Sequence, residues 1–162
     1  MIQTDLSSRS LNTAIKQVAK YKRQLVNRAD TLVAALVGYG VEFAKMELAE
    51  LDGVEGGSLM SRIEGYFDVD SHAGFIRAGS PYAVYVEFGT GVIGKSHKHL
   101  QADKQGWIYD INDHGEAGWV YWDEYVGGFR WTKGQKSRSF MMNTVSELHL
   151  ECERLAREVF NR

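Results

Sequence analysis

The sequence predicts an α+β fold with a long N-terminal helix, a central, mostly antiparallel sheet that includes an aromatic hairpin, and a C-terminal helix packed on the sheet. Apolar residues recur at three- and four-residue steps over residues 8–51 and again over 139–160. Residues 59–132 instead hold short β-branched and aromatic runs separated by glycine-rich turns. Because the strands cluster and do not alternate with helices, the order is α+β.

The composition indicates a single domain over residues 1–162. A chain with 44% hydrophobic and 25% charged residues can bury one substantial core but is too short for two comfortable ones. The net charge of -2 argues against nonspecific electrostatic binding of nucleic acid by the whole surface. A lone cysteine, Cys152, lies in an apolar pattern, which predicts a small core side chain and a reducing compartment. The apolar runs are short of the roughly 20 residues that cross a bilayer, so we expect no membrane contact and assembly in the cytoplasm.

An amphipathic helix is predicted over residues 8–51, with lysines and arginines on its solvent face. Gly38 and Gly40 interrupt it and predict a kink or a change of register, because each costs about 1 kcal/mol in a helix interior. The apolar stripe of this helix contains Leu11, Ile15, Val18, Leu25, Ala29, Leu32 and Leu36.

Two short strands, residues 66–70 and 74–78, are predicted to form a hairpin. The polar residues 92–106 are interpreted as a mobile loop. A second, aromatic hairpin is predicted to pair residues 107–111 with 119–122.

The C-terminal part is predicted to begin with a last strand at residues 129–132, followed by a turn at 133–136. A helix then runs from about Ser139 to Phe160. Its apolar stripe is the most regular in the chain and consists of Met141, Val145, Leu148, Cys152, Leu155 and Val159.

The stretch from Ser80 to Gly91 joins the helical and sheet regions, and its conformation is ambiguous. β-branched and aromatic residues favour a strand. Ser80 as a cap, proline at position 81 and Gly89 beyond the end favour a short helix, which is the conformation that we expect. Since apolar residues fall on both faces, we also expect this block to be buried on two sides.

Residues 89–96 match the phosphate-binding pattern G-x-x-x-x-G-K-[ST], with Lys95 as its lysine. Such a loop requires a parallel strand before it and a helix that begins at the lysine. The polar residues that follow and the short remaining chain argue against repeated βαβ units. The favoured interpretation is a glycine-rich turn, and a P-loop-like nucleotide site remains the alternative.

Histidines 97, 99 and 114 could form a metal site with nearby aspartates, but a solvated polar loop is favoured because their spacing is poor and no cysteine supports them. Glu87, between two apolar residues, is interpreted as a partnered structural carboxylate and not as a general base. We therefore expect neither a catalytic centre nor a cofactor.

One segment of the chain has Tyr-Ala followed by Val-Glu-Phe-Gly-Thr-Gly, and a second has Gly-Gln, basic residues and Phe-Met at the start of the last helix. These two segments resemble a family of bacteriophage tail-completion or head-tail joining (neck) proteins. The family commonly has proline before that phenylalanine, where this chain has Ser139. The residues that carry the resemblance are Tyr82, Ala83, Glu87, Phe88, Gly89, Thr90, Gly91, Gly134 and Phe140.

The resemblance implies a structural virion protein that forms a ring, expected to be a hexamer, between the head connector or stopper and the tail tube or tail terminator. Phage DNA would pass through the lumen and touch it incidentally. A generic phage assembly adaptor is a further alternative. The aromatic content suggests interface residues at Trp107, Tyr109, Trp119 and Trp122, although packing within one subunit explains them equally well. On the interface interpretation, alanine at Trp107 or Trp122 weakens assembly more than folding.

Overall fold

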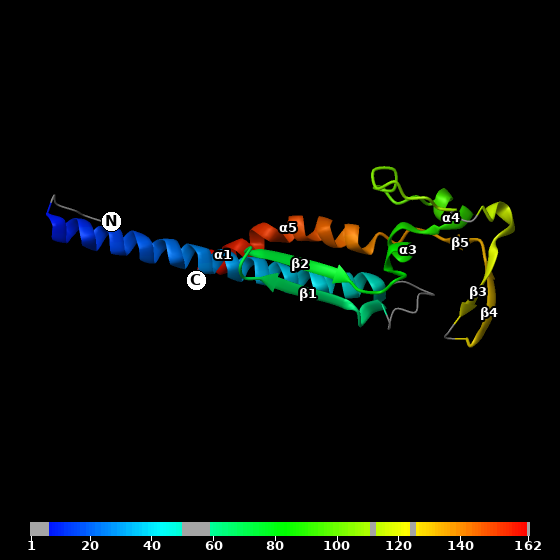
Figure 1. The fold of residues 1–162 in the computed structure, drawn as a ribbon, viewed down its shortest axis with the longest axis horizontal. Helices are drawn as coiled ribbons and strands as arrows, with labels where there is room; N and C mark the ends of the chain where they lie inside the picture. The colour runs from blue at the N-terminus through cyan, green and yellow to red at the C-terminus, as the bar shows by residue number, and fades with distance from the viewer. Residues whose placement is uncertain (1–6, 50–58, 111–112, 124–125, 162) are drawn as a thin grey trace.

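A computed structural model describes residues 7–49, 59–110, 113–123 and 126–161 (Figure 1). Its elongated body is built on α1 (Ser8–Ala49), with α5 (Phe140–Phe160) alongside. The two helices are antiparallel: the Asn143 amide donates to Glu47 at one end of the pair, and the Arg28 guanidinium donates to the carbonyl of Phe160 at the other. Both predicted long helices and the α+β class are therefore confirmed.

The first hairpin consists of β1 (Ile63–Asp68) and β2 (Ala73–Ala78), and it lies along the C-terminal half of α1 (Figure 1). Gly65 and Gly74 face α1 so closely that a Cβ atom on either would lie 2.5 Å from a methyl group of Val37. The predicted hairpin is thus confirmed, with strand limits shifted by up to three residues.

The Ser80 to Gly91 stretch forms α3 (Ala83–Phe88), which confirms the expected short helix. Burial on two sides is wrong, because Val84 and Tyr85 are each 41% exposed while Ala83 and Val86 face the core. A six-residue helix has one side for the core and one for solvent.

The segment predicted as a loop, 92–106, instead contains most of α4 (Gly91–Ser96) and a series of turns. It is anchored inward, since His99 and Ala102 are 4% and 1% exposed. Polar composition concealed this, because much of the segment's packing relies on hydrogen bonds.

The second hairpin is formed by β3 (Trp119–Asp123) and β4 (Gly128–Thr132), after the 3₁₀ turn η1 (Gly115–Ala117). The predicted pairing of 107–111 with 119–122 is wrong: residues 107–110 are not a strand, and 111 lies outside the described residues. The predicted last strand became the partner, while β5 (Gly134–Gln135) pairs with Thr90 and Gly91. The described strands of the two hairpins form two separate sheets.

The core lies where α1, β1, α3 and the start of α5 meet. Two predictions about the helices fail there: α1 continues through Gly38 and Gly40, and Cys152 is exposed. Gly40 serves packing, because a Cβ on it would lie 2.4 Å from Ile76 Cδ1. The buried core residues are Ala44, Leu48, Leu59, Ile63, Ala83, Val86 and Phe140.

Neither α1 nor α5, the long helices of the described part of the chain, is apolar enough to cross a membrane.

Candidate functional site

Glu87 is the centre of a highly connected polar site among the described residues. It lies on α3 with 8% of its surface exposed, and it points at the start of α5. Its two carboxylate oxygens accept hydrogen bonds from the backbone N–H groups of Met141, at 2.8 Å, and Met142, at 3.0 Å. These groups belong to the first turn of the helix, where N–H donors lack helical partners and negative charge is favoured. Glu87 therefore caps α5 from another element.

His99 completes this site. Its Nε2 lies 3.0 Å from Glu87 Oε1, and its Nδ1 accepts the backbone N–H of Gln101 at 3.0 Å. Because Nδ1 is an acceptor, a neutral imidazole carries its proton on Nε2 and donates it to the carboxylate. Both ring nitrogens are thereby occupied by partners within the chain. The prediction that Glu87 is a partnered carboxylate is confirmed, and its structural role stays a prediction.

Aromatic rings enclose the histidine and link the 97–109 segment to α3. The Phe88 ring centroid is 4.3 Å from that of His99 and 5.1 Å from that of Trp107. Trp107 Nε1 donates to the carbonyl of Gly89 at 3.0 Å, and the Tyr109 hydroxyl accepts the backbone N–H of His99 at 3.0 Å. Trp107 and Tyr109, two of the four predicted interface residues, thus make contacts within the fold of the chain itself.

The glycine turn after Phe88 packs against β5, with which it forms two antiparallel bridges. Gly89, Gly91 and Gly134 have φ values of 79°, 63° and 101°, which favour glycine. A Cβ on Gly91 would lie 2.4 Å from the carbonyl oxygen of Lys133, and one on Gly134 would lie 1.9 Å from that of Thr90. Two backbone segments far apart in sequence can approach this closely only without side chains.

The other residues that carry the family resemblance lie at the same place. We call this place, where α3, the glycine turn, β5 and the start of α5 meet, the junction. Ala83 and Phe140 are buried in the core, and Tyr82 packs against it. The backbone N–H of Ser139 donates to the carbonyl of Glu87 at 3.1 Å. Ser139 has a φ of 52°, which proline cannot adopt, so the departure from the family pattern coincides with a different backbone conformation at this position.

The arrangement of residues 89–96 differs from that of a phosphate-binding loop. The element before it is α3 and not a strand, and the strand pairs of the two described hairpins are antiparallel. The Gly91 N–H donates to the carbonyl of Tyr109 at 2.6 Å, and the Ile93 N–H to that of Lys133 at 3.4 Å. A phosphate cradle needs such N–H groups free and convergent.

The three candidate metal-binding histidines have different surroundings and different contacts. His99 is bonded to Glu87, His97 is exposed at the end of α4, and the ring of His114 is tilted by 39° against that of Trp119. Hydrogen bonds from the backbone N–H groups of Gly115 and His114 lower the pKa of Asp110, as expected of a turn carboxylate. Within the described ranges, groups of three metal-ligating side chains are absent.

Trp119 and Trp122, the other two predicted interface residues, differ in exposure. Trp119 is half-buried between His114 and Gly91, whereas Trp122 is 54% exposed and meets the ring of Phe129. Sequence reasoning did not select Phe129 and Trp131, which are 76% and 58% exposed. These two residues could not be selected without knowing that β3 pairs with β4, which places them beside Val120 and Trp122.

Fold and site together define a small α+β protein whose buried charged residues form a structural junction. No family model, curated protein or solved structure matches the chain.

Trp107 provides a test of the junction. We expect Trp107→Ala to lower the free energy of unfolding by about 2 kcal/mol, because it removes a half-buried ring and a hydrogen bond to Gly89. This revises the expectation of an assembly defect at this residue. Urea denaturation checks it, with Trp122→Ala as the control that changes stability by less than about 1 kcal/mol. Equal losses in the two variants would contradict the assignment.

Proposed function

We propose that the chain is a nonenzymatic structural subunit of a tailed bacteriophage, assembling into a ring in the neck or tail. The resemblance of the Tyr82 to Gly91 and Gly134 to Phe140 segments to neck proteins gives the setting. These segments lie at the junction just described, where α3, the glycine turn, β5 and the start of α5 meet. Head connector and tail proteins are the expected neighbours, and DNA passes through the lumen.

The observation that carries self-assembly is an exposed apolar face on the second hairpin. Val120 pairs with Trp131 and Trp122 with Phe129, so all four side chains lie on one side of the sheet. We call them the aromatic face, and each is more than half exposed. A two-stranded hairpin is marginally stable alone, and exposed tryptophan and phenylalanine are typical anchors of protein interfaces. The aromatic face is therefore the proposed contact with the next subunit or neck protein.

The geometry of Glu87 and His99 favours a structural over a catalytic role. A general base needs a free nitrogen or carboxylate oxygen facing its substrate. Here both histidine nitrogens and both carboxylate oxygens have partners within the chain. The pair is better suited to fixing the start of α5.

Truncating the aromatic face tests assembly. We expect Trp122→Ala to weaken self-association at least tenfold, since a tryptophan anchor is worth about 2 kcal/mol or more in an interface. Light scattering coupled to size exclusion measures this. Tyr121→Ala, on the opposite side of the same strand, is the matched control.

The phage setting is tested separately by co-expression with the products of adjacent genes. Capture by a head connector or a tail-tube protein is the expected result. Binding of a fluorescent ATP analogue with magnesium, lost in Lys95→Ala, would instead establish the nucleotide site.

A further inference from the structure

The N-terminal half of α1 extends beyond every other described element of the subunit. Arg28 meets Phe160 at the end of α5, and Asp30 meets His72, next to the start of β2, at a distance of 2.7 Å. The part of α1 that α5 and the first hairpin cover therefore starts at about residue 28. We call Ser8–Arg28 the arm; its 21 residues span about 30 Å at 1.5 Å per residue (Figure 1).

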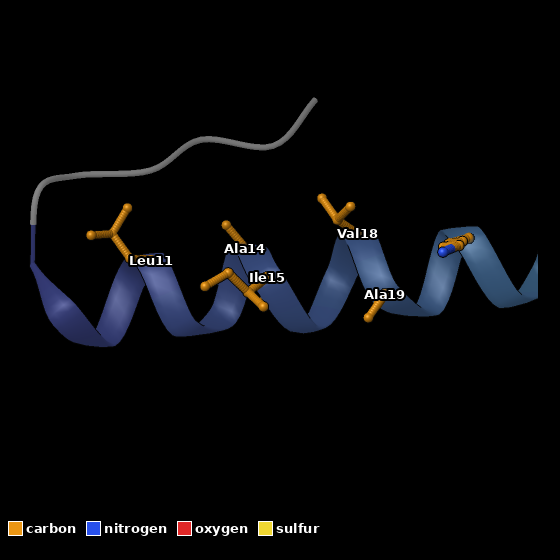
Figure 2. A pocket seen from close by; sticks show the side chains of 6 residues that line it. Leu11, Ala14, Ile15, Val18 and Ala19 are labelled. Atoms are coloured by element: carbon orange, nitrogen blue, oxygen red, sulfur yellow. The ribbon is translucent and has the colours of Figure 1, made fainter.

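An apolar stripe runs along the arm. Ile15 and Val18 are 65% and 56% exposed, and Leu11 and Leu25 are also exposed. Figure 2 shows side chains of this stripe on successive turns, where they line a hollow. The stripe continues the side of α1 that α5 covers farther along, so the arm has the pattern of a packed helix. Among the described residues, Lys22 is the one charged residue that lines the hollow.

Charge is divided sharply between the arm and the rest of the chain. Six of the 19 basic residues and none of the 21 acidic ones lie between Ser8 and Arg28. The arm therefore carries +6, and since the whole chain carries -2, the remainder carries -8. Two arms repel each other and offer Lys22 no acidic partner, whereas the remainder of a second copy attracts the arm.

The outer face of the first hairpin has the complementary chemistry. Tyr66 and Phe75 are 53% and 44% exposed, and their rings stack with centroids 4.9 Å apart. Glu64 and Asp68 lie on the same side of β1, because side chains alternate along a strand. The Ser71 hydroxyl and the Asp70 N–H lower the pKa of Asp68, so it is ionised at neutral pH. Arg77 lies opposite Glu64 on this side, so the face is an apolar centre with a carboxylate at each end, and Asp68 is the one that faces no basic residue across the hairpin.

We propose that the arm of one copy binds the outer face of the β1–β2 hairpin of a second copy, with its apolar stripe on Tyr66 and Phe75 and Lys22 beside the carboxylates. The arm cannot reach its own hairpin, because α1 is one continuous helix that carries it past the hairpin's tip. The contact joins two different surfaces, so it repeats from copy to copy and closes into a ring if the rotation permits. The inference rests on the self-assembly in the proposed function and names a contact distinct from the aromatic face.

The test measures self-association of the full chain by sedimentation equilibrium. We expect Lys22→Glu to weaken association at least tenfold and the double variant Lys22→Glu, Glu64→Lys to restore it. Ile15→Ser with Val18→Ser should weaken association similarly, while the circular dichroism spectrum stays unchanged because these side chains are exposed. Asn27→Ser, on the side of the arm away from the stripe, is the matched control.

Each contrary result has a distinct meaning. Stronger association of Lys22→Glu overturns the proposal in favour of arm-to-arm pairing, since that change relieves repulsion. Rescue by Glu153→Lys on α5, and not by Glu64→Lys, overturns the choice of hairpin. Unchanged association of all arm variants overturns the arm contact, while loss of association in Trp122→Ala leaves the proposed ring standing. A chain that stays monomeric in every variant and the wild type overturns it as well.

Discussion

Replacing Glu87 with alanine is expected to lower the free energy of unfolding by about 3 kcal/mol or more. Three donors lose their acceptor: the N–H groups of Met141 and Met142, and Nε2 of His99. Each buried donor left without a partner costs about 1–3 kcal/mol, and loss of a helix cap costs about 1 kcal/mol. In a chain of this size the unfolding midpoint should fall by about 6–12 °C.

The control for this variant is another glutamate in a solvated setting. Glu42→Ala removes a carboxylate that pairs with Lys45 and whose side chain is 77% exposed, so its cost should stay below about 0.5 kcal/mol. Glu87→Gln keeps one acceptor oxygen and should fall between the two. A Glu87→Ala protein as stable as Glu42→Ala would show that the carboxylate does not hold α5 in place.

Gly134→Ala should destabilise the chain by about 3–4 kcal/mol, for a different reason. Its φ of 101° is unfavourable for any side chain, and the new Cβ would lie 1.9 Å from the carbonyl oxygen of Thr90. The clash involves backbone on both sides, so it cannot be relieved by rotating a side chain. Relief requires β5 to separate from the glycine turn, which chemical denaturation detects as a lower midpoint.

Gly106→Ala separates the two contributions in that prediction. Gly106 also has a positive φ, of 63°, but a Cβ there meets open space. Its substitution should cost only the conformational term of about 1–2 kcal/mol. If Gly134→Ala costs no more than Gly106→Ala, the close approach of β5 to Thr90 is not a constraint on the fold.

The regular elements were predictable because their periodicity is local. Repeats of three and four residues predicted both long helices. The short helix α3 was predicted with its end at Gly89, but its N-cap is Tyr82 and not Ser80. Strand pairing was not predictable from composition alone. Trp107 and its neighbours have β-like composition, but their rings and N–H groups are used against Phe88 and Gly89. The signal that was overlooked is Gly127-Gly128, where Gly127 has a positive φ directly before β4 begins at Gly128.

The site was predictable in part. An isolated glutamate among apolar residues indicated a partnered carboxylate, and that was confirmed at Glu87. Its partners could not be named, since they are backbone groups at the start of α5 and a histidine in a polar segment. His99 has no distinguishing sequence context; only the turn that brings Gln101 to its Nδ1 identifies it. The exposure of the arm was equally hidden, because a stripe does not reveal whether its own chain covers it.

Native mass spectrometry of the full chain tests the central claim, self-assembly through the aromatic face, most directly. The wild type should appear as one closed species of several copies, with six expected from the resemblance to neck proteins. Trp122→Ala combined with Phe129→Ala should shift it to monomers that keep the circular dichroism spectrum of the wild type. A wild type that is monomeric at every concentration, or an oligomer indifferent to both substitutions, would contradict the account.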